Sequence, residues 1–260
     1  MSTIIYPSPI FGPVRSRRLG ISLGVNLMPA DGKVCTFDCV YCECGFNADR
    51  RPTLPRPTRE QVAAALEEKL KEMVFDGELP DVITFAGNGE PTAHPRFAEI
   101  VDDTLQLRNQ YCPKAKVSVL SNSTFIHRPE VRTALMKIDN NILKLDTIDP
   151  IYINNVDRPT QKSYNVEDII GHMKEFHGHI IIQTMFMQGT LSNGFSVDNT
   201  KEEYVAPWLD AIRQIAPQEV MIYTIDRETP DHNLKKASHK TLDGICERVK
   251  AMGIKCSASY

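Results

Sequence analysis

Four of the seven cysteines in this chain lie close together, at Cys35, Cys39, Cys42 and Cys44. The first three have the spacing C-x3-C-x2-C, which places three thiols in one short segment. Thiolates bind soft metal ions and iron–sulfur clusters. Because the N-terminus lacks the cationic and apolar regions of a secretory signal, we expect a cytoplasmic protein, in which thiols stay reduced. The spacing therefore predicts a metal or redox site rather than disulfides.

Zinc and iron–sulfide are the two kinds of site to compare. A structural zinc site needs four ligands, usually two close pairs separated by a longer gap, and no matching Cys or His pair follows this triplet. Three thiolates within residues 35–42 suit a cube of iron and sulfide, and they leave one iron without a protein ligand. An open iron can bind a substrate. The fourth thiol, Cys44, either tunes such a cluster, touches substrate or is a small buried residue.

A glycine-rich turn with one carboxylate follows a short apolar run. Its sequence is GNGEPT, residues 87–92. Glycines let the main chain approach a ligand closely, and Glu90 supplies a charge-assisted acceptor for an ammonium group. A plain connection from strand to helix, with Pro91 and Thr92 opening the helix, is the alternative interpretation.

Polar residues also end two further expected strands. Ser121 and Asn122 end one, and Lys144 and Asp146 lie on the same face of the next, because side chains alternate along a strand. If that face points into a barrel, its two charges need partners, and a charged cofactor is a suitable one. A surface ion pair at a solvated strand end is the alternative.

The rest of the chain alternates strand and helix patterns. A helix is expected over residues 58–75, where Thr58 and Gln61 form a capping box. A second capping box is expected at Thr200 and Glu203, with Pro207 either kinking that helix or starting it. Strands are expected at residues 20–27, 81–87, 116–122, 141–148, 179–186 and 219–225, with 253–259 as a terminal edge segment.

This alternation predicts a single α/β domain. Strands separated by helices pair in parallel, because each helix returns the chain to the same edge of the sheet. Six such units follow one another, and periodicity alone leaves open a barrel or a doubly wound sheet. If the fold is a barrel, its site lies at the carboxyl ends of the strands. The loops that carry Cys35 to Cys42, Gly87 to Glu90 and Asn122 all begin there.

Composition and charge exclude several classes of protein. The 260 residues are 42% hydrophobic and 24% charged, which argues against disorder, and no apolar run is long enough to span a bilayer, so we expect no membrane association. The net charge of −3 argues against a protein that coats nucleic acid through charge alone. Arg15, Arg17 and Arg18 form a basic cluster that is either a solvated arm or a grip for an anionic substrate.

CTFDCVYC at residues 35–42 resembles the cluster loop of the radical S-adenosylmethionine (SAM) superfamily, and GNGEPT resembles that superfamily's glycine-glycine-glutamate-proline turn, with Asn88 as the departure. The resemblance implies a 4Fe–4S cluster and SAM as cofactors, the amino and carboxylate groups of SAM taking the open iron. The implied metal ligands are Cys35, Cys39 and Cys42. The implied cofactor-binding residues are Tyr41, Gly87, Asn88, Gly89, Glu90, Pro91, Ser121 and Asn122, and the implied catalytic residues are Lys144 and Asp146.

The resemblance also implies a fold and an activity. The fold is a partial (β/α)6 TIM-like barrel over residues 21–260, preceded by an arm at 1–20. The flanking sequences look like the group related to wyosine-forming tRNA enzymes, but this chain has no cysteine before Cys35 to hold their second cluster, so we do not expect their reaction. The implied activity is reductive cleavage of SAM to a 5′-deoxyadenosyl radical, which abstracts hydrogen from an RNA, such as tRNA, or from a small metabolite.

A flavodoxin or ferredoxin is the expected electron donor. Two other functions remain open at this point. One is a glycyl-radical-enzyme activating protein, which acts on a protein. The other is a metal-binding scaffold without turnover.

Overall fold

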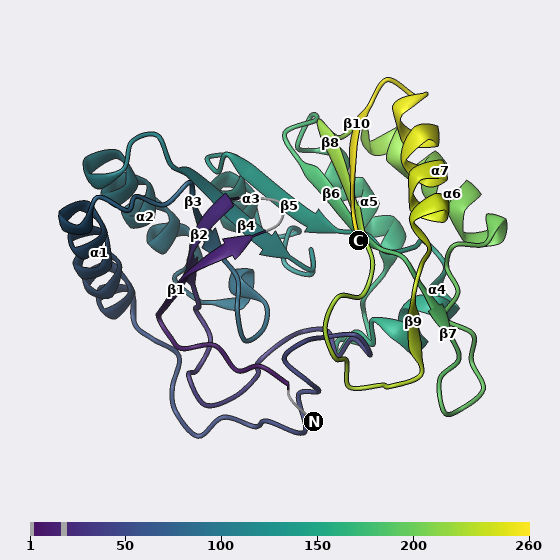
Figure 1. Cartoon of the computed structure of the whole chain (residues 1–260), viewed down its shortest axis with the longest axis horizontal. Coiled ribbons are helices and arrows are strands. Elements are labelled where there is room, and N and C mark those ends of the chain that lie inside the picture. The colour runs from purple at the N-terminus through teal and green to yellow at the C-terminus, as the bar shows by residue number, and fades with distance from the viewer. Residues whose placement is uncertain (1–2, 17–19) are drawn as a thin grey trace.

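The fold is built on one twisted sheet of eight strands. The computed structural model describes residues 3–16 and 20–260. The strands lie in the order β1-β2-β3-β4-β5-β6-β8-β10, and every neighbouring pair is parallel except β1 with β2 (Figure 1). Their bounds are Ile10–Ser16 (β1), Gly20–Val25 (β2), Val82–Phe85 (β3), Lys116–Ser121 (β4), Asn140–Lys144 (β5), Ile181–Met185 (β6), Glu219–Tyr223 (β8) and Lys255–Ser259 (β10).

Helices follow most strands and lie along the outside of the curved sheet (Figure 1). They are α1 (Arg59–Asp76), the 3-10 turn η1 (Pro91–Ala93), α2 (Phe97–Tyr111), α3 (Pro129–Leu135), α4 (Pro150–Val156), α5 (Val166–Lys174), α6 (Glu202–Ile215) and α7 (His239–Lys250). A small antiparallel pair, β7 (Met187–Gly189) with β9 (Leu234–Lys236), lies beyond the ends of β6 and β8. In the described part of the chain, no helix combines the length and apolar character needed to cross a bilayer.

The predicted α/β class and the partial barrel are confirmed. Residues 20–25 form β2 inside the sheet, and residues 255–259 form the edge strand β10, as expected from the sequence. The sheet stays open between its two edge strands, β1 and β10. The sequence did not indicate β1, which lies within residues 1–20 and pairs antiparallel with β2.

One expected helix start is right and one is wrong. Thr58 caps α1 through the predicted capping box with Gln61. At α6, Lys201 is the N-cap residue, because the Thr200 hydroxyl instead donates to the Asp198 carboxylate at 2.6 Å. Pro207 lies inside α6, so that helix does not start at the proline.

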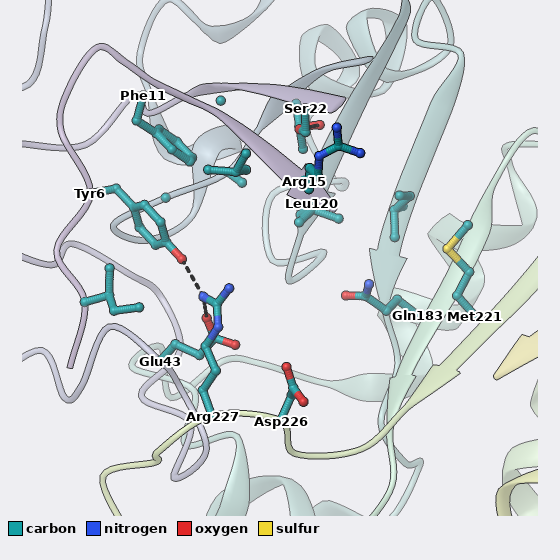
Figure 2. A pocket seen from close by; sticks show the side chains of 17 residues that line it. Tyr6, Phe11, Arg15, Ser22, Glu43, Leu120, Gln183, Met221, Asp226 and Arg227 are labelled. Atoms are coloured by element: carbon teal, nitrogen blue, oxygen red, sulfur yellow. Dashed lines mark hydrogen bonds and ion pairs between the residues drawn. The ribbon is translucent and has the colours of Figure 1, made fainter. Parts of the chain in front are cut away.

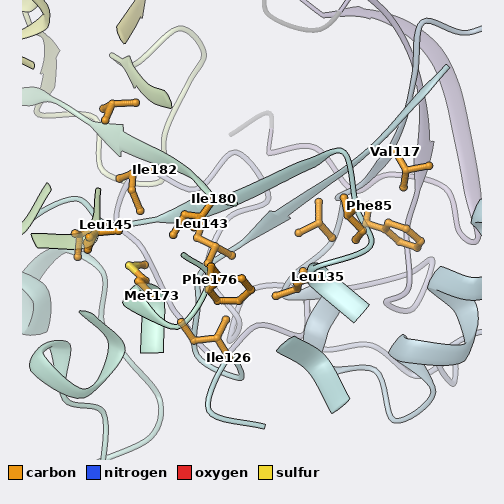
Figure 3. Close-up of a cluster of buried hydrophobic side chains, with 14 of the residues drawn as sticks. Phe85, Val117, Ile126, Leu135, Leu143, Leu145, Met173, Phe176, Ile180 and Ile182 are labelled. Carbon is orange, nitrogen blue, oxygen red and sulfur yellow. The ribbon is translucent and has the colours of Figure 1, made fainter. Parts of the chain in front are cut away.

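The two faces of the sheet have different surroundings. Ile83 and Val119 are fully buried in the main core, together with Leu66 of α1. The next residues along the same strands, Thr84 and Leu120, point to the opposite face, where they line a cavity. Figure 3 shows the core between β5, β6 and the helices. Apolar burial on one face therefore holds the strands in place, while the other face lines the cavity.

Candidate functional site

The cysteine triplet lies in the long connection between β2 and α1, at the carboxyl ends of the strands. Val34 forms an isolated parallel bridge with Gly89, and its main-chain N–H donates to the Asn88 carbonyl at 2.9 Å. The Asn47 side chain closes the loop: its Oδ1 accepts from the N–H of Cys35 at 3.1 Å, and its Nδ2 donates to the Phe37 carbonyl at 3.1 Å. The loop is thus fixed against the glycine-rich turn by protein contacts alone.

The three thiols have distinct surroundings. The Asn122 amide nitrogen is 3.6 Å from the Cys35 sulfur, and the Cys39 sulfur is 3.8 Å from an Asp157 carboxylate oxygen. Burial raises the pKa of Cys35 to about 12 and that of Cys39 well above its usual value. Hydrogen bonding from the neighbouring Cys44 thiol, aided by a buried lysine, lowers the pKa of Cys42 to about 6 despite burial.

The donor set fits an iron–sulfur cube better than a single ion. Among the residues that the structure describes, no three His, Cys, Asp or Glu side chains converge on a point that would hold one metal ion. In a cube, each thiolate binds a different iron, so the three sulfurs need only surround a common space. Cys35, Cys39 and Cys42 lie in one loop that Asn47 holds closed, with the Asn122 amide nitrogen near the Cys35 sulfur, so this donor set suits such a cube.

Two glycines let the turn after β3 reach the cysteine loop. Gly89 has φ 144°, and a Cβ there would overlap the Val34 carbonyl oxygen. Gly87 has φ 127°, and its Cβ would lie 2.7 Å from the Asn26 side chain. Both positions therefore require glycine, as the motif predicts.

The Asn88 side chain explains why this turn departs from two adjacent glycines. It is fully buried, and its Nδ2 donates to the carbonyls of Tyr6 at 2.8 Å and Pro29 at 2.9 Å. Its Oδ1 accepts from the Tyr6 N–H at 2.8 Å. The amide thus ties the turn to the N-terminal segment, and the side chain faces protein partners.

The Glu90 carboxylate joins the turn to the end of β4. It accepts from the Ser121 hydroxyl at 2.8 Å, the Asn122 N–H at 2.6 Å and both the N–H and the hydroxyl of Thr92, which lies just after Pro91 at the start of η1. Of these four bonds, Oε2 receives the one from Asn122. Burial raises the pKa of Glu90 above its usual range, while the donors oppose that rise. The structure therefore brings together Glu90, Ser121 and Asn122.

Lys144 and Asp146 meet Tyr41 of the cysteine loop. Lys144 Nζ is 3.1 Å from an Asp146 oxygen and 4.5 Å from the Tyr41 ring centroid, and the Tyr41 hydroxyl contacts both charged groups. Burial lowers the pKa of Lys144, but the neighbouring Asp146 carboxylate outweighs it and raises that pKa well above its usual value. The Asp146 carboxylate is buried, the Lys144 side chain is 15% exposed and the two charges are paired, so they are not a solvated surface pair.

Asp157 completes this charged group, and the sequence did not single it out. Its carboxylate is 3.0 Å from the Tyr41 hydroxyl as well as near Cys39. Burial, reinforced by the Asp146 carboxylate, raises the pKa of Asp157 well above its usual range. Asp157 follows α4, whose short pattern gave no helix signal in the sequence.

A cavity of about 570 Å³ lies on the inner face of the sheet (Figure 2). It extends from Glu43 and Gly87, beside the cysteine loop, to Arg15 at the opposite end of the strands. Arg227 closes part of its wall, with one ion pair to Glu43 at 2.7 Å and one bond to the Tyr6 hydroxyl at 3.2 Å. Each parallel strand except β10 contributes side chains to its lining, among them Ser22, Thr84, Leu120, Ile142, Gln183 and Met221. Of the predicted basic cluster, Arg17 and Arg18 lie outside the described residues.

Comparisons with known proteins agree with this geometry. A family model described as the radical SAM superfamily matches residues 31–192. A UPF0026 protein of Helicobacter pylori (strain ATCC 700392 / 26695) is 31% identical over 224 residues, which cover 85% of this chain and 67% of that protein. The UPF0026 protein MJ1312 of Methanocaldococcus jannaschii is 30% identical over 198 residues, 74% of this chain and 58% of that protein. The chain thus spans about two thirds or less of these relatives.

Two solved structures share the fold at low sequence identity. A radical SAM methyltransferase from Sphaerobacter thermophilus superimposes with a TM-score of 0.64 at 12% identity, covering 92% of this chain and 66% of that chain. TYW1 with a lysine-pyruvate adduct bound superimposes with a TM-score of 0.60 at 13% identity, covering 88% of this chain and 73% of that chain. At such identities the likeness shows the fold alone.

Proposed function

Because the chain belongs to the radical SAM superfamily, whose members bind a 4Fe–4S cluster and SAM, we propose that it is an enzyme that cleaves SAM reductively and abstracts hydrogen from a substrate in the cavity. The bridge between Val34 and Gly89 carries this proposal. It joins the cysteine loop to the turn that carries Glu90, and Gly87 of that turn lines the cavity. A cofactor bound by both would therefore face the space on the inner side of the sheet.

The cysteine loop supplies the metal ligands in this proposal. Cys35, Cys39 and Cys42 hold the cluster and leave one iron for the cofactor. When bound, the cluster and SAM supply one-electron cleavage of a carbon–sulfur bond and a 5′-deoxyadenosyl radical. The loop's task is to hold three thiolates in a fixed arrangement, and the bonds of Asn47 do this before any metal enters.

Residues on the neighbouring loops bind the cofactor. Glu90 Oε2 and the main chain of the glycine turn accept the ammonium group, because a buried carboxylate gains from a cationic partner. Ser121 and Asn122 lie beside Glu90, where they contact the ribose and carboxylate. Tyr41 presents its ring to the adenine.

Lys144 and Asp146 are the polar residues that we place at the reacting end of the site. Their pairing keeps two charges in a buried position, and Lys144 is oriented by Tyr41 and Asp146. In this proposal, the Lys144 ammonium interacts with the carboxylate of the cofactor. Asp146 holds Lys144 through Oδ2, and its other oxygen, Oδ1, accepts the Met185 N–H at 2.8 Å, which fixes the Asp146 side chain. The buried network also excludes water from the radical.

The substrate in this proposal is an RNA, such as tRNA, or a small metabolite. A cavity of about 570 Å³ admits a cofactor and a group of limited size, such as one nucleoside. The aromatic rings of Tyr6 and Phe11, whose centroids are 4.6 Å apart, form one wall on which a planar group can stack. A flavodoxin or ferredoxin of the cytoplasm delivers the electron.

Replacement of each ligand cysteine tests the reaction. We expect Cys35→Ala, Cys39→Ala and Cys42→Ala to lose bound iron after anaerobic reconstitution and to form no 5′-deoxyadenosine from SAM after reduction. Cys112→Ala is the matched control, because this buried thiol lies outside the loop, at the end of α2. A single ligand variant that keeps both iron and SAM cleavage would contradict the assignment. A colourless wild-type protein that takes up zinc would instead favour the metal-binding scaffold.

The substrate needs a separate experiment. Comparison of nucleosides and metabolites between cells with and without this protein should reveal one missing modified product. Binding to tRNA that weakens steeply with salt would support an RNA substrate. A stable complex with a protein that acquires a radical signal would support an activating enzyme and contradict the RNA or metabolite proposal.

A further inference from the structure

A buried lysine lies inside the cysteine loop. The side chain of Lys33 is 1% exposed, and its Nζ donates to the Gly45 carbonyl at 2.7 Å. Its main-chain N–H donates to the Arg50 carbonyl at 2.8 Å, so the backbone is held as well. The lysine therefore crosses the loop from a point before Cys35 to a point after Cys44. No motif in the sequence marks this residue.

The charge of Lys33 is only partly neutralised by its carboxylate neighbour. Asp38 Oδ1 is 3.5 Å from Nζ, and the same oxygen accepts the Asn47 N–H at the shorter distance of 2.7 Å. The Asp38 side chain is also 26% exposed, so water screens it. A buried ammonium needs closer compensation than this.

The turn that carries Cys42 lies beside this ammonium, because Nζ donates to the Gly45 carbonyl and the Gly45 N–H donates to the Cys42 carbonyl at 2.9 Å. Burial lowers the pKa of Lys33, but attraction to Cys42, Cys35 and Cys39 outweighs it and raises the pKa above its usual value. The ammonium of Lys144, whose side chain is 15% exposed, differs because its partner Asp146 is buried and only 3.1 Å away. Lys33 thus places a fixed positive charge inside the loop that carries the three cysteines.

We propose that Lys33 stabilises the reduced form of the cluster and so raises its reduction potential. The inference rests on the proposed function, because it requires a cluster on Cys35, Cys39 and Cys42. Reduction adds one negative charge to the cluster, and a nearby positive charge favours the more negative state. Net charge and hydrogen bonds to the sulfurs are known determinants of cluster potential. Lys33 acts through the cluster and does not touch the substrate.

Charge and hydrogen bonding at Lys33 can be separated by substitution. Lys33→Met removes both, Lys33→Gln keeps an N–H donor without charge, and Lys33→Arg keeps the charge. Lys69→Met is the matched control, because Lys69 lies on α1 and pairs with Glu72 at the surface. The reconstituted proteins are titrated anaerobically with a reductant while the reduced cluster is followed by electron paramagnetic resonance, and iron and sulfide are counted per chain.

We expect the two neutral variants to bind a cluster but to reduce it less readily. At the wild-type midpoint, their ratio of reduced to oxidised cluster should fall about tenfold, which is 59 mV for a one-electron couple. Lys33→Arg and Lys69→Met should keep the wild-type midpoint. A wild-type midpoint in fully loaded Lys33→Gln would overturn the proposal. Loss of iron from Lys33→Arg and from both neutral variants would also overturn the proposal. In that case a role of Lys33 in shaping the cysteine loop would explain the results without any effect of its charge on the potential.

The outcome also separates this inference from the proposed function. A wild-type protein that takes up no 4Fe–4S cluster overturns both. A loaded wild-type protein whose midpoint is shared by the neutral Lys33 variants overturns the inference about Lys33 alone.

Discussion

At the scale of single residues, the Glu90 carboxylate holds its turn to the end of β4, in addition to the cofactor-binding role that we propose for it. We expect Glu90→Gln to lower the free energy of unfolding of the metal-free protein by about 1–3 kcal/mol, since an amide nitrogen would face the N–H donors that now bond to a carboxylate. Urea unfolding measures this change. Glu99→Gln, on the exposed face of α2, should change stability little. Equal stability of the two variants would contradict the bonding described.

The sequence alone identified the candidate residues whose type and spacing already indicate a chemical role. Three cysteines in one segment, and a glutamate after two glycines, are visible without a fold. Lys33 was missed because no motif marks it, although its contacts with Asp38 and Gly45 are local in the sequence. Asp157 was missed because its contacts are long-range. The Asp157 carboxylate meets the Tyr41 hydroxyl across 116 positions of sequence, and only the folded chain brings them together.

At the scale of elements, the glycine turn can approach the cysteine loop only because Gly89 has no side chain. We expect Gly89→Ala to destabilise the protein by about 3 kcal/mol or more, because its φ is positive and the added Cβ would meet the main chain of Val34. Gly171→Ala is the matched control: it lies in α5 with open space around it, so alanine should stabilise the helix by about 1 kcal/mol. Denaturant unfolding compares the two. A tolerated alanine at position 89 would refute the close approach of the two loops.

The segment after η1 predicts a dependence of stability on pH. His94 donates from Nε2 to the Pro57 carbonyl at 2.9 Å and accepts the Arg96 N–H on Nδ1 at 3.1 Å, so the folded protein holds a neutral ring. Burial lowers its pKa below 6.5. Below pH 6.5 the unfolded chain therefore binds more protons at His94 than the folded protein does, and stability falls as pH falls.

Replacing His94 should flatten that dependence. We expect Glu90 and its turn to stay in place in His94→Gln, whose amide can still donate to Pro57, while the loss of stability below pH 6.5 becomes smaller. His232→Gln, at an exposed position in the loop before β9, should keep the wild-type slope. Thermal unfolding across this pH range provides the measurement, and an unchanged slope in His94→Gln would count against a neutral buried ring.

The elements were predictable where local pattern and tertiary packing agree. Helix α1 was expected from its capping box and the helical spacing of its apolar residues, and strand β3 from a short β-branched and aromatic run that ends in glycine. The second capping box failed because Asp198 competes for the Thr200 hydroxyl. Strand β1 was missed because it contains Gly12 and Pro13 and gains its stability from pairing with β2.

At the scale of the whole molecule, the fold separates the core from the chemistry. The largest core cluster joins the outer faces of the strands to the helices, and none of Cys35, Cys39 and Cys42 belongs to it. Those cysteines lie in or against a second, smaller cluster with Phe37 and Val40. The sheet's open inner face is left for the cavity. One layer of strands thus packs against the main core on one side and lines the cavity, where we propose that substrate binds, on the other.

This separation predicts that the protein stays folded when its metal is removed. Chelation of the reconstituted protein should leave the far-UV circular dichroism unchanged, because the main core and the bonds from Lys33 and Asn47 need no metal. The melting temperature should fall only by the amount that binding of the metal cluster to the folded protein had raised it. Hydrogen exchange should quicken within residues 26–50 while β3 to β6 stay protected. Loss of helical signal on chelation would contradict this, and would mean that metal binding and folding are coupled as in small zinc domains.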